Sequence, residues 1–324
     1  MKPELFRQFG VAFPSYFVLL ITGFVFAGIA AALTVRREGL DPDVMIDTNL
    51  AMLLAGVVGA RILHVIADGY FWDYVHLCTD PSRVDWKISQ AACVDPRAGY
   101  DGWWDAAKGV CHPRSTDCFA WARFWAGGLT YYGGFIGAVA VAIPLLKRDK
   151  FPFWKAADYA AIGIPIGLAF GRMGCLLAGC CFGARCELPW AMAFPGDSPA
   201  SEAQHDLHLL TSSRFASLPV HPTQVYESVA SLVIAAICWL YVNPRKRYDG
   251  EVFAWFLALY AGARFVIEYL RRDARGGLLG MSTSQLIGLA LIAAAYALHR
   301  ARKKTGEVAP ASTSAPADEA QAHG

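Results

Sequence analysis

Three arginines lie in or beside apolar stretches, where a charged side chain is costly. Arg172 and Arg264 each follow a glycine-containing apolar segment, and Arg61 lies within another. A charge at the depth of a bilayer costs about 2.5–3.5 kcal/mol, so it usually lines a cavity or pairs with an opposite charge. A guanidinium can hold a phosphate or a carboxylate through two parallel hydrogen bonds. These arginines therefore predict a site for an anionic group.

Two glutamates offer a structural alternative. Glu268 follows Arg264 by four residues, which puts both on one face of a helix. Glu227, in another predicted helix, could neutralise Arg172 through an ion pair between helices. The charges alone leave open whether the arginines serve a ligand or form structural ion pairs. Further arginines follow in the chain and would attract anions to the same region: Arg271, Arg272 and Arg275.

Four cysteines follow Arg172 with the spacing C-x4-C-C-x4-C, at positions 175, 180, 181 and 186. Structural zinc sites usually combine closely spaced cysteine pairs, so this spacing predicts no metal. Adjacent cysteines such as Cys180 and Cys181 rarely bond to each other, because their Cα geometry is poor. A bond from either of them to Cys175 or Cys186 and a set of plain buried thiols both remain open.

A second group of cysteines lies earlier in the chain, at positions 78, 93, 111 and 118. Their even number predicts two disulfides if this segment faces an oxidising compartment, with three pairings possible. Later in the chain, HPTQVYE (221–227) opens an apolar stretch with a proline, which suits the first turn of a helix. Gln224 and Glu227 are three residues apart and would share a polar face there.

The elements that must position these residues are apolar helices. Only 17% of the residues are charged, against about a quarter in soluble chains. Runs without any charge can cross ~30 Å of hydrocarbon as helices. We predict an all-α integral membrane protein with about seven transmembrane helices, at about 12–35, 48–67, 126–146, 154–176, 222–242, 251–270 and 278–298.

Basic residues mark one side of the membrane. They gather in alternate connections, at 36–37, 147–155, 245–247 and 300–304, and such loops stay cytoplasmic. The N-terminus and the long segments 68–123 and 177–221 then face outward, which in a bacterium is the periplasm, and the C-terminus is cytoplasmic. The net charge of +2 indicates no particular partner, and no nucleic acid is expected.

These spans make residues 1–304 one membrane domain. It includes an outward insert rich in cysteine and tryptophan at 75–122 and an outward head segment at 177–221. The tail 305–324 is small, polar and rich in proline and alanine, a composition typical of disorder.

Four motifs together resemble the bacterial phosphatidylglycerol–prolipoprotein diacylglyceryl transferase family: GRMGCLLAGCCFG, HPTQVYE, GLTYYGGFIGA and LYAGARFVIEYLRRD. The resemblance covers about 16–285, apart from the insert. It implies an inner-membrane enzyme that moves a diacylglyceryl group from phosphatidylglycerol to the lipobox cysteine of a preprolipoprotein. A thioether forms and glycerol 1-phosphate leaves. It also implies a periplasm-facing cavity open to the lipid bilayer, and neither a metal nor an organic cofactor.

The resemblance implies roles for individual residues. Arg172 and Arg264 would hold the headgroup phosphate, and Glu268 would orient an arginine or the substrate. Tyr132 stands where the family has a histidine, a proposed base for the acceptor thiol, and so joins the catalytic set. The other residues expected to bind substrate, with Arg61 included for its charge, are Tyr16, Arg61, Gly133, Gly134, Gly174, His221, Gln224, Glu227 and Tyr260.

The chain departs from the family's pattern at several polar positions. Cys175 and Ala178 stand where the family has asparagines, and Cys180 stands where it has a glutamate. A tyrosine titrates near ~10, which makes Tyr132 a poor base at neutral pH. A thiol beside an arginine ionises more readily. Either another group deprotonates the acceptor thiol or the acceptor differs.

Two alternative functions therefore stay open. An enzyme of the same fold could transfer a lipid or phosphoglyceryl group to another acceptor, which the replaced polar residues and the long insert favour. A non-enzymatic lipid-binding, transport or thiol-redox membrane protein is the other alternative. The cysteine cluster favours it, and the absence of a C-x-x-C motif counts against it.

Overall fold

The computed structural model describes residues 4–8, 11–86, 88, 90–94, 101–124, 128–271, 277–278 and 281–305. The chain divides into two compact units, the first made of Met1–Asp47 and Leu146–Gly324 and the second of Thr48–Leu145. Arg272, Arg275 and nearly all of the tail predicted to be disordered lie outside the described residues.

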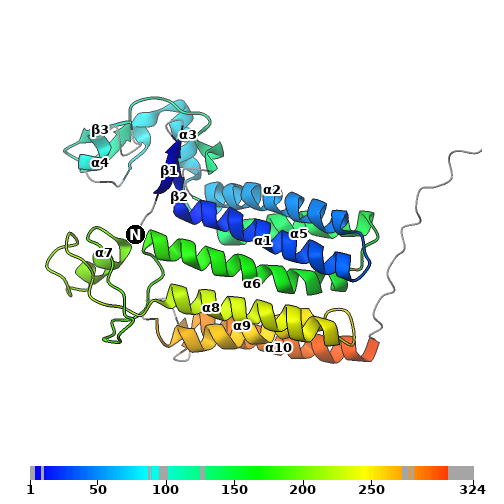
Figure 1. The fold of residues 1–324 in the computed structure, drawn as a ribbon. Coiled ribbons are helices and arrows are strands. Elements are labelled where there is room, and N and C mark those ends of the chain that lie inside the picture. Colours follow the sequence, from blue (N-terminus) through cyan, green and yellow to red (C-terminus); the bar gives the residue numbers. More distant parts are fainter. Residues whose placement is uncertain are drawn as a thin grey trace, which may run out of the picture. The chain divides into compact units, whose positions relative to one another are not determined.

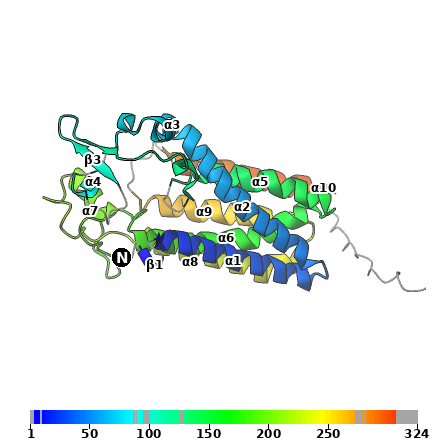
Figure 2. The same ribbon diagram turned by 90° about the horizontal axis from the view of Figure 1, so that it is seen from above.

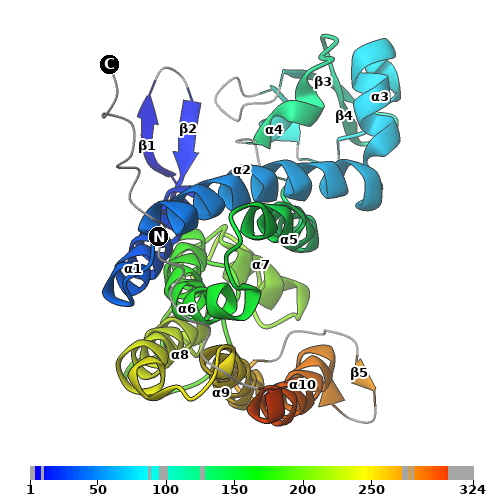
Figure 3. The same cartoon turned by 90° about the vertical axis from the view of Figure 1, so that its right-hand side faces the viewer.

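Long helices make up most of the first unit. Figure 3 looks along them and shows them in the order α1, α6, α8, α9, α10, each beside the next. Their bounds are α1 Ser15–Arg37, α6 Phe153–Ala178, α8 Thr223–Ala236, α9 Glu251–Glu268 and α10 Thr283–Thr305. A π-helical turn, Ile237–Val242, and a 3-10 turn, Asn243–Arg245, continue α8. Buried apolar side chains of α6, α8 and α9, among them Ile162, Ile234 and Val252, form one core of this unit.

Small residues allow α1 and α6 to pack closely. A Cβ atom on Gly174 would lie only 3.0 Å from the Cα atom of Tyr16, and one on Gly163 would lie 3.2 Å from the carbonyl oxygen of Ala27. Close approach of this kind is how membrane helices gain packing contacts without a hydrophobic driving force. Gly174 thereby places Tyr16 beside the end of α6.

The start of α9 is fixed by a carboxylate from α6. The buried Asp158 accepts hydrogen bonds from the backbone N–H groups of Gly250, at 2.9 Å, and Phe253, at 3.0 Å. These N–H groups have no partner within the helix, and a negative charge is favoured at a helix N-terminus. This contact ties α6 to α9 at the end opposite the residues predicted to form the site.

The segment between α6 and α8 forms a head with little regular structure. It contains the short helix α7, Pro199–Asp206. Figure 1 shows α7 at the end of the unit where α6 finishes and α8 begins. Two short hairpins also belong to this unit and were not predicted: β1 Glu4–Gln8 with β2 Val11–Pro14, and β5 Gly277–Leu278 with β6 Met281–Ser282.

The second unit contains most of two long helices and most of the predicted insert. Figure 2 shows β3 and α4, which contact each other in this unit. The elements are α2 Pro42–Ala67, α3 Phe71–Thr79, η1 Pro81–Arg83, α4 Gln90–Val94, β3 Gly102–Asp105, β4 Val110–Pro113, η3 Ala120–Ala122 and α5 Tyr131–Arg148. Disulfides join Cys78 to Cys118 and Cys93 to Cys111, which confirms two bonds and selects one of the three pairings.

Each of the seven predicted spans overlaps a helix, although the last, 278–298, begins in β5 and its helix α10 starts only at Thr283. Among the described residues, four helices are long and apolar enough to cross a membrane: α1, α2, α6 and the stretch from α8 to Arg245. The helices α5 and α9 have only 18 residues each, near the lower limit of about 17–25 for a span. The protein is thus mostly helical with several membrane-spanning candidates, and the count of seven crossings stays a prediction.

Candidate functional site

Glu227 of α8 binds three arginines at one end of the first unit. Its two carboxylate oxygens lie 2.7 Å from Arg172 Nε, 3.0 Å from Arg264 Nη1 and 3.3 Å from Arg271 Nη1. Arg264 also lies 2.9 Å from Glu268, through Nη2 and Oε2. The structure therefore brings together two of the three arginines that the sequence singled out and both glutamates, and adds Arg271 to them.

The ends of three helices position this group. Arg172 lies near the end of α6, Glu227 lies in the second turn of α8, and Arg264 and Glu268 lie in the last turns of α9. Because α6 leads into the head segment and α8 leads out of it, both place their polar ends on the same side.

The group carries a formal charge of +1, from three arginines and two glutamates. Exposed fractions of the side chains are 6% for Glu227, 8% for Glu268, 2% for Arg271 and 11% for Arg264, whereas Arg172 reaches 22%. Burying unbalanced charge is costly, so a ligand of opposite sign is favoured here. Arg172 is the most accessible donor for such an anion.

Two tyrosines border the group. Tyr16 of α1 is 42% exposed and contacts the end of α6 at Gly174. Tyr260 lies one turn before Arg264 on α9 and stacks on Phe256, with ring centroids 5.9 Å apart. The predicted substrate residues Gly174 and Tyr260 thus belong to the helices that carry Arg172 and Arg264, and Tyr16 packs against the first of these helices.

HPTQVYE holds the turn that follows α6. Thr223 Oγ1 donates to the carbonyl of Cys181 at 2.8 Å, and Gln224 Nε2 donates to that of Cys180 at 2.7 Å. His221 lies beside Tyr226, with 3.5 Å between Nδ1 and the hydroxyl oxygen. Gln224 is fully buried, so its contact in this structure is to the protein backbone. The predicted contacts of His221 and Gln224 with substrate stay predictions.

Three of the four clustered cysteines meet beside Arg172. The sulfur atoms of Cys175, Cys180 and Cys181 all lie within 4.8 Å of one another. All four cysteines, Cys186 included, are free thiols, so the structure does not contain the disulfide considered from the sequence. Left-handed backbone at Gly179 (φ 73°) and Cys181 (φ 61°) folds the chain back and brings the sulfurs together. Cysteine spacing alone does not reveal such a turn.

Cys181 lies beyond the end of α6 and has an altered acidity. Hydrogen bonds from the thiols of Cys175 and Cys180, with the nearby charges of Arg172 and Arg271, lower the pKa of the Cys181 thiol. Desolvation opposes this shift but does not cancel it. The arginine group therefore favours a thiolate at its edge.

Four predicted site residues belong to the second unit. Arg61 is buried there, and its guanidinium donates to the carbonyls of Trp121, Gly128 and Ala120 and to the hydroxyl of Tyr74, at 2.6–3.1 Å. These contacts favour a structural role, and binding of substrate by Arg61 stays a prediction.

The other three residues of the second unit lie at the start of α5. Tyr132 is 64% exposed and packs edge-on against Tyr131. A Cβ on Gly133 would collide with the carbonyl oxygen of Gly59 in α2, and one on Gly134 would lie 3.4 Å from that of Gly56. Here these glycines serve helix packing, and their approach to lipid stays a prediction.

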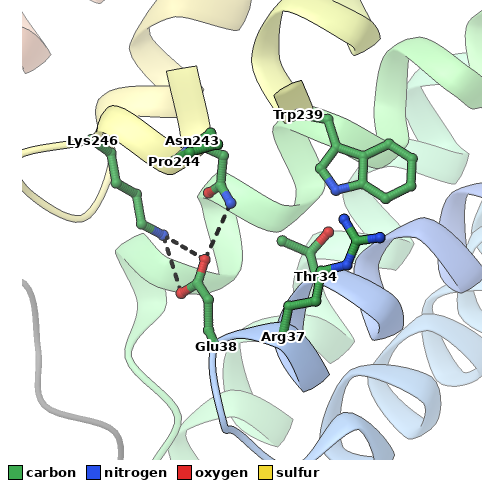
Figure 4. Close-up of a pocket in the computed structure, with 7 residues that line it drawn as sticks. All are labelled: Thr34, Arg37, Glu38, Trp239, Asn243, Pro244 and Lys246. Carbon is green, nitrogen blue, oxygen red and sulfur yellow. Dashed lines mark hydrogen bonds and ion pairs between the residues drawn. The ribbon is translucent and has the colours of Figure 1, made fainter. Parts of the chain in front are cut away.

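A cavity of about 440 Å³ lies at the other end of the first unit. Figure 4 shows Glu38 receiving hydrogen bonds from Lys246 and Asn243, with Arg37 beside Trp239. The remaining lining residues are Thr34 and Pro244. None of the predicted site residues lines this cavity, which lies between the basic end of α1 and the turns that follow α8.

The sequence did not predict the contacts that two residues make in this site. Arg271 was noted only as one of several arginines beyond α9, whereas it binds Glu227 directly. Cys181 was treated as one of an adjacent pair, whereas it joins the three-sulfur cluster. The only sequence signal for either was proximity to a residue already singled out.

Comparison with known proteins finds one matching family model, described as prolipoprotein diacylglyceryl transferase. It matches residues 3–88 and 111–300, and the unmatched stretch between them falls inside the predicted insert 75–122. The matched ranges contain all five members of the arginine–glutamate group, as well as Cys175, Cys180 and Cys181.

Individual relatives carry a related name. The chain is 26% identical over 313 residues to phosphatidylglycerol–prolipoprotein diacylglyceryl transferase 2 of Clostridium perfringens, covering 95% of this chain and 100% of the relative. It is 24% identical over 291 residues to the Clostridium tetani transferase, covering 89% and 93%. A shorter match, 37% identical over 185 residues, relates it to the transferase of Chromobacterium violaceum, covering 54% and 64%.

Proposed function

Because this chain belongs to the prolipoprotein diacylglyceryl transferase family, we propose that it transfers a diacylglyceryl group from phosphatidylglycerol to a prolipoprotein. The enzyme is a transferase of the bacterial inner membrane. The acceptor is the thiol of the lipobox cysteine. Its sulfur attacks the carbon of the diacylglyceryl group that is bonded to the phosphate oxygen. A C–S bond forms, and the bond between that carbon and the phosphate oxygen breaks. The electron pair stays on the phosphate oxygen, and glycerol 1-phosphate leaves.

The observation that carries the proposal is the buried group around Glu227, with its charge of +1. The exposed edge of Arg172 offers donors to the headgroup phosphate. Negative charge grows on that phosphate as the C–O bond breaks, so prearranged arginines stabilise the transition state more than the ground state. Glu227 and Glu268 hold the guanidinium groups in place.

The acceptor thiol must lose its proton, because the thiolate is the nucleophile. We assign Tyr132 to the catalytic set as the residue at the histidine position, with Glu268 and His221 as further candidates. A thiol of ordinary pKa, about 8.5, is already partly ionised near neutral pH. A weak base therefore suffices once the leaving group is stabilised.

The arrangement in the membrane follows from the charges. The basic end of α1 and the basic residues Arg245 and Lys246 beyond α8 lie opposite the arginine–glutamate group within the first unit. Basic segments stay cytoplasmic, so the site, the head segment and the N-terminus face the periplasm in this proposal. The chain crosses the bilayer seven times and its C-terminus is cytoplasmic.

Reconstitution tests the function. Purified protein in phosphatidylglycerol vesicles is expected to add one diacylglyceryl mass to the cysteine of a lipobox peptide. A peptide with serine in place of that cysteine is expected to gain nothing. The Clostridium perfringens relative, prepared in the same way, serves as the positive control. The proposal is rejected if the relative modifies the peptide and this protein does not.

A further inference from the structure

We infer that Cys175, Cys180 and Cys181 form a binding site for one thiophilic d10 metal ion of the zinc class, held by three thiolates next to Arg172. This inference does not depend on the proposed transfer reaction. It also differs from what the cysteine spacing and the family resemblance imply, which is the absence of a metal.

The sulfur positions are close to those that an ion requires. A zinc–sulfur bond is about 2.3 Å long, which puts two sulfurs of a tetrahedral ion about 3.8 Å apart. The three sulfurs already lie within 4.8 Å of one another, so side-chain adjustments of about 1 Å complete the site. Three protein ligands leave the fourth position of the tetrahedron for water, the pattern that zinc adopts outside purely structural sites.

The backbone around the cluster is held in an unusual shape. Cys181 adopts a left-handed conformation (φ 61°), which a residue with a side chain rarely adopts. Two side chains of α8 fix this turn: Thr223 binds the carbonyl of Cys181, and Gln224 binds that of Cys180. The three thiols are therefore gathered by built-in contacts of the fold.

The cluster adjoins the arginine–glutamate group, whose net positive charge complements anionic thiolate ligands. Arg172 and Arg271 act on the Cys181 thiol from the arginine–glutamate group. A divalent ion with three thiolates carries a formal charge of −1. Its sign is opposite to that of the neighbouring arginines, so the occupied metal site and the arginines attract one another. Softness selects the ion, because thiolates prefer zinc and its heavier relatives over magnesium or calcium.

Cadmium provides the probe, since its thiolate complexes absorb in the ultraviolet. Metal-stripped full-length protein, with its two disulfides intact, is titrated in detergent with Cd²⁺. We expect a charge-transfer absorption that saturates at one ion per chain and is lost in Cys175→Ser, Cys180→Ser and Cys181→Ser. The variant Cys186→Ser, which removes a free thiol outside the cluster, is expected to keep it.

A second measurement avoids variants that fail to fold. The native protein is alkylated with and without Cd²⁺, and each modified cysteine is identified by mass spectrometry. Protection of Cys175, Cys180 and Cys181, with Cys186 still reactive, supports the site. The inference is overturned if no saturable absorption appears, if Cys186 is protected equally, or if Cys175, Cys180 and Cys181 are equally reactive with and without the ion.

Discussion

Arg172 and Glu227 form the closest ion pair of the arginine–glutamate group, with 2.7 Å between Nε and Oε2. Glu227 is shared with Arg264 and Arg271, so a single carboxylate orders three guanidinium groups. The two glutamates therefore fix the arginines and neutralise all but one of their charges, which leaves a formal surplus of +1 in the group.

Replacing Glu227 tests whether its carboxylate holds the three guanidinium groups in place. Glu227→Gln keeps the shape of the side chain but leaves three arginines without their common partner. Breaking a buried ion pair costs about 3–5 kcal/mol, so we expect a clear loss of thermal stability in detergent together with loss of transfer. Glu187→Gln is the control, because Glu187 is 85% exposed and its pair with Arg185 is worth at most about 1 kcal/mol. Equal stability of the two variants would contradict this role of Glu227.

The close packing of α1 on α6 makes a separate prediction. In Gly174→Ala the new methyl group would lie 3.0 Å from the backbone of Tyr16. Forcing the helices apart is expected to cost about 1–3 kcal/mol of unfolding free energy. Gly262→Ala has no atom within 4 Å of its new methyl group and should stabilise α9 by about 0.5–1 kcal/mol. Both are measured by thermal unfolding, and a stabilised Gly174→Ala would refute the packing.

The disulfides of the second unit should contribute to its stability. The bond between Cys93 and Cys111 closes a loop with a sequence separation of 18. A loop of this size is expected to contribute about 3 kcal/mol through the unfolded state. Cys93→Ala with Cys111→Ala should lower the denaturant midpoint, whereas Cys186→Ala, which removes a free thiol, should not. An unchanged midpoint in the double variant would contradict the prediction.

The lowered pKa of Cys181 predicts how the alkylation of its thiol depends on pH. Its pKa is lowered, so at a given pH a larger fraction is thiolate in the folded protein than in the unfolded chain. Alkylation of Cys181 should therefore persist at pH values below the ordinary thiol pKa of about 8.5 and move to higher pH on unfolding. Arg172→Ala should also move the folded profile upward, because Arg172 is one cause of the shift. Coincident profiles for folded and unfolded protein would exclude a lowered pKa.

The sequence predicted local relationships well. Charges in apolar stretches and the four-residue spacing of Arg264 and Glu268 are visible in the chain, and the structure pairs them. Each predicted span overlaps a helix for the same reason, since apolar length is a property of a single segment.

Relationships that depend on chain reversal were missed. The meeting of Cys175, Cys180 and Cys181 requires left-handed backbone at Gly179 and Cys181, which cysteine spacing does not encode. The disulfide pairing depends equally on how the insert folds. Glu227 and Arg271 are 44 residues apart, so their contact follows from helix packing alone.

The proposed binding of the headgroup phosphate by Arg172 and Arg264 can be measured through the transfer rates of matched variants. Arg172→Ala and Arg264→Ala, reconstituted in phosphatidylglycerol vesicles with a lipobox peptide, are compared with Lys147→Ala in the basic last turn of α5. Removing one donor to a developing oxyanion costs about 10²–10³ in rate. We therefore expect both arginine variants to lose transfer by at least that factor while Lys147→Ala matches the unmodified protein. Folded arginine variants with undiminished transfer would contradict the account.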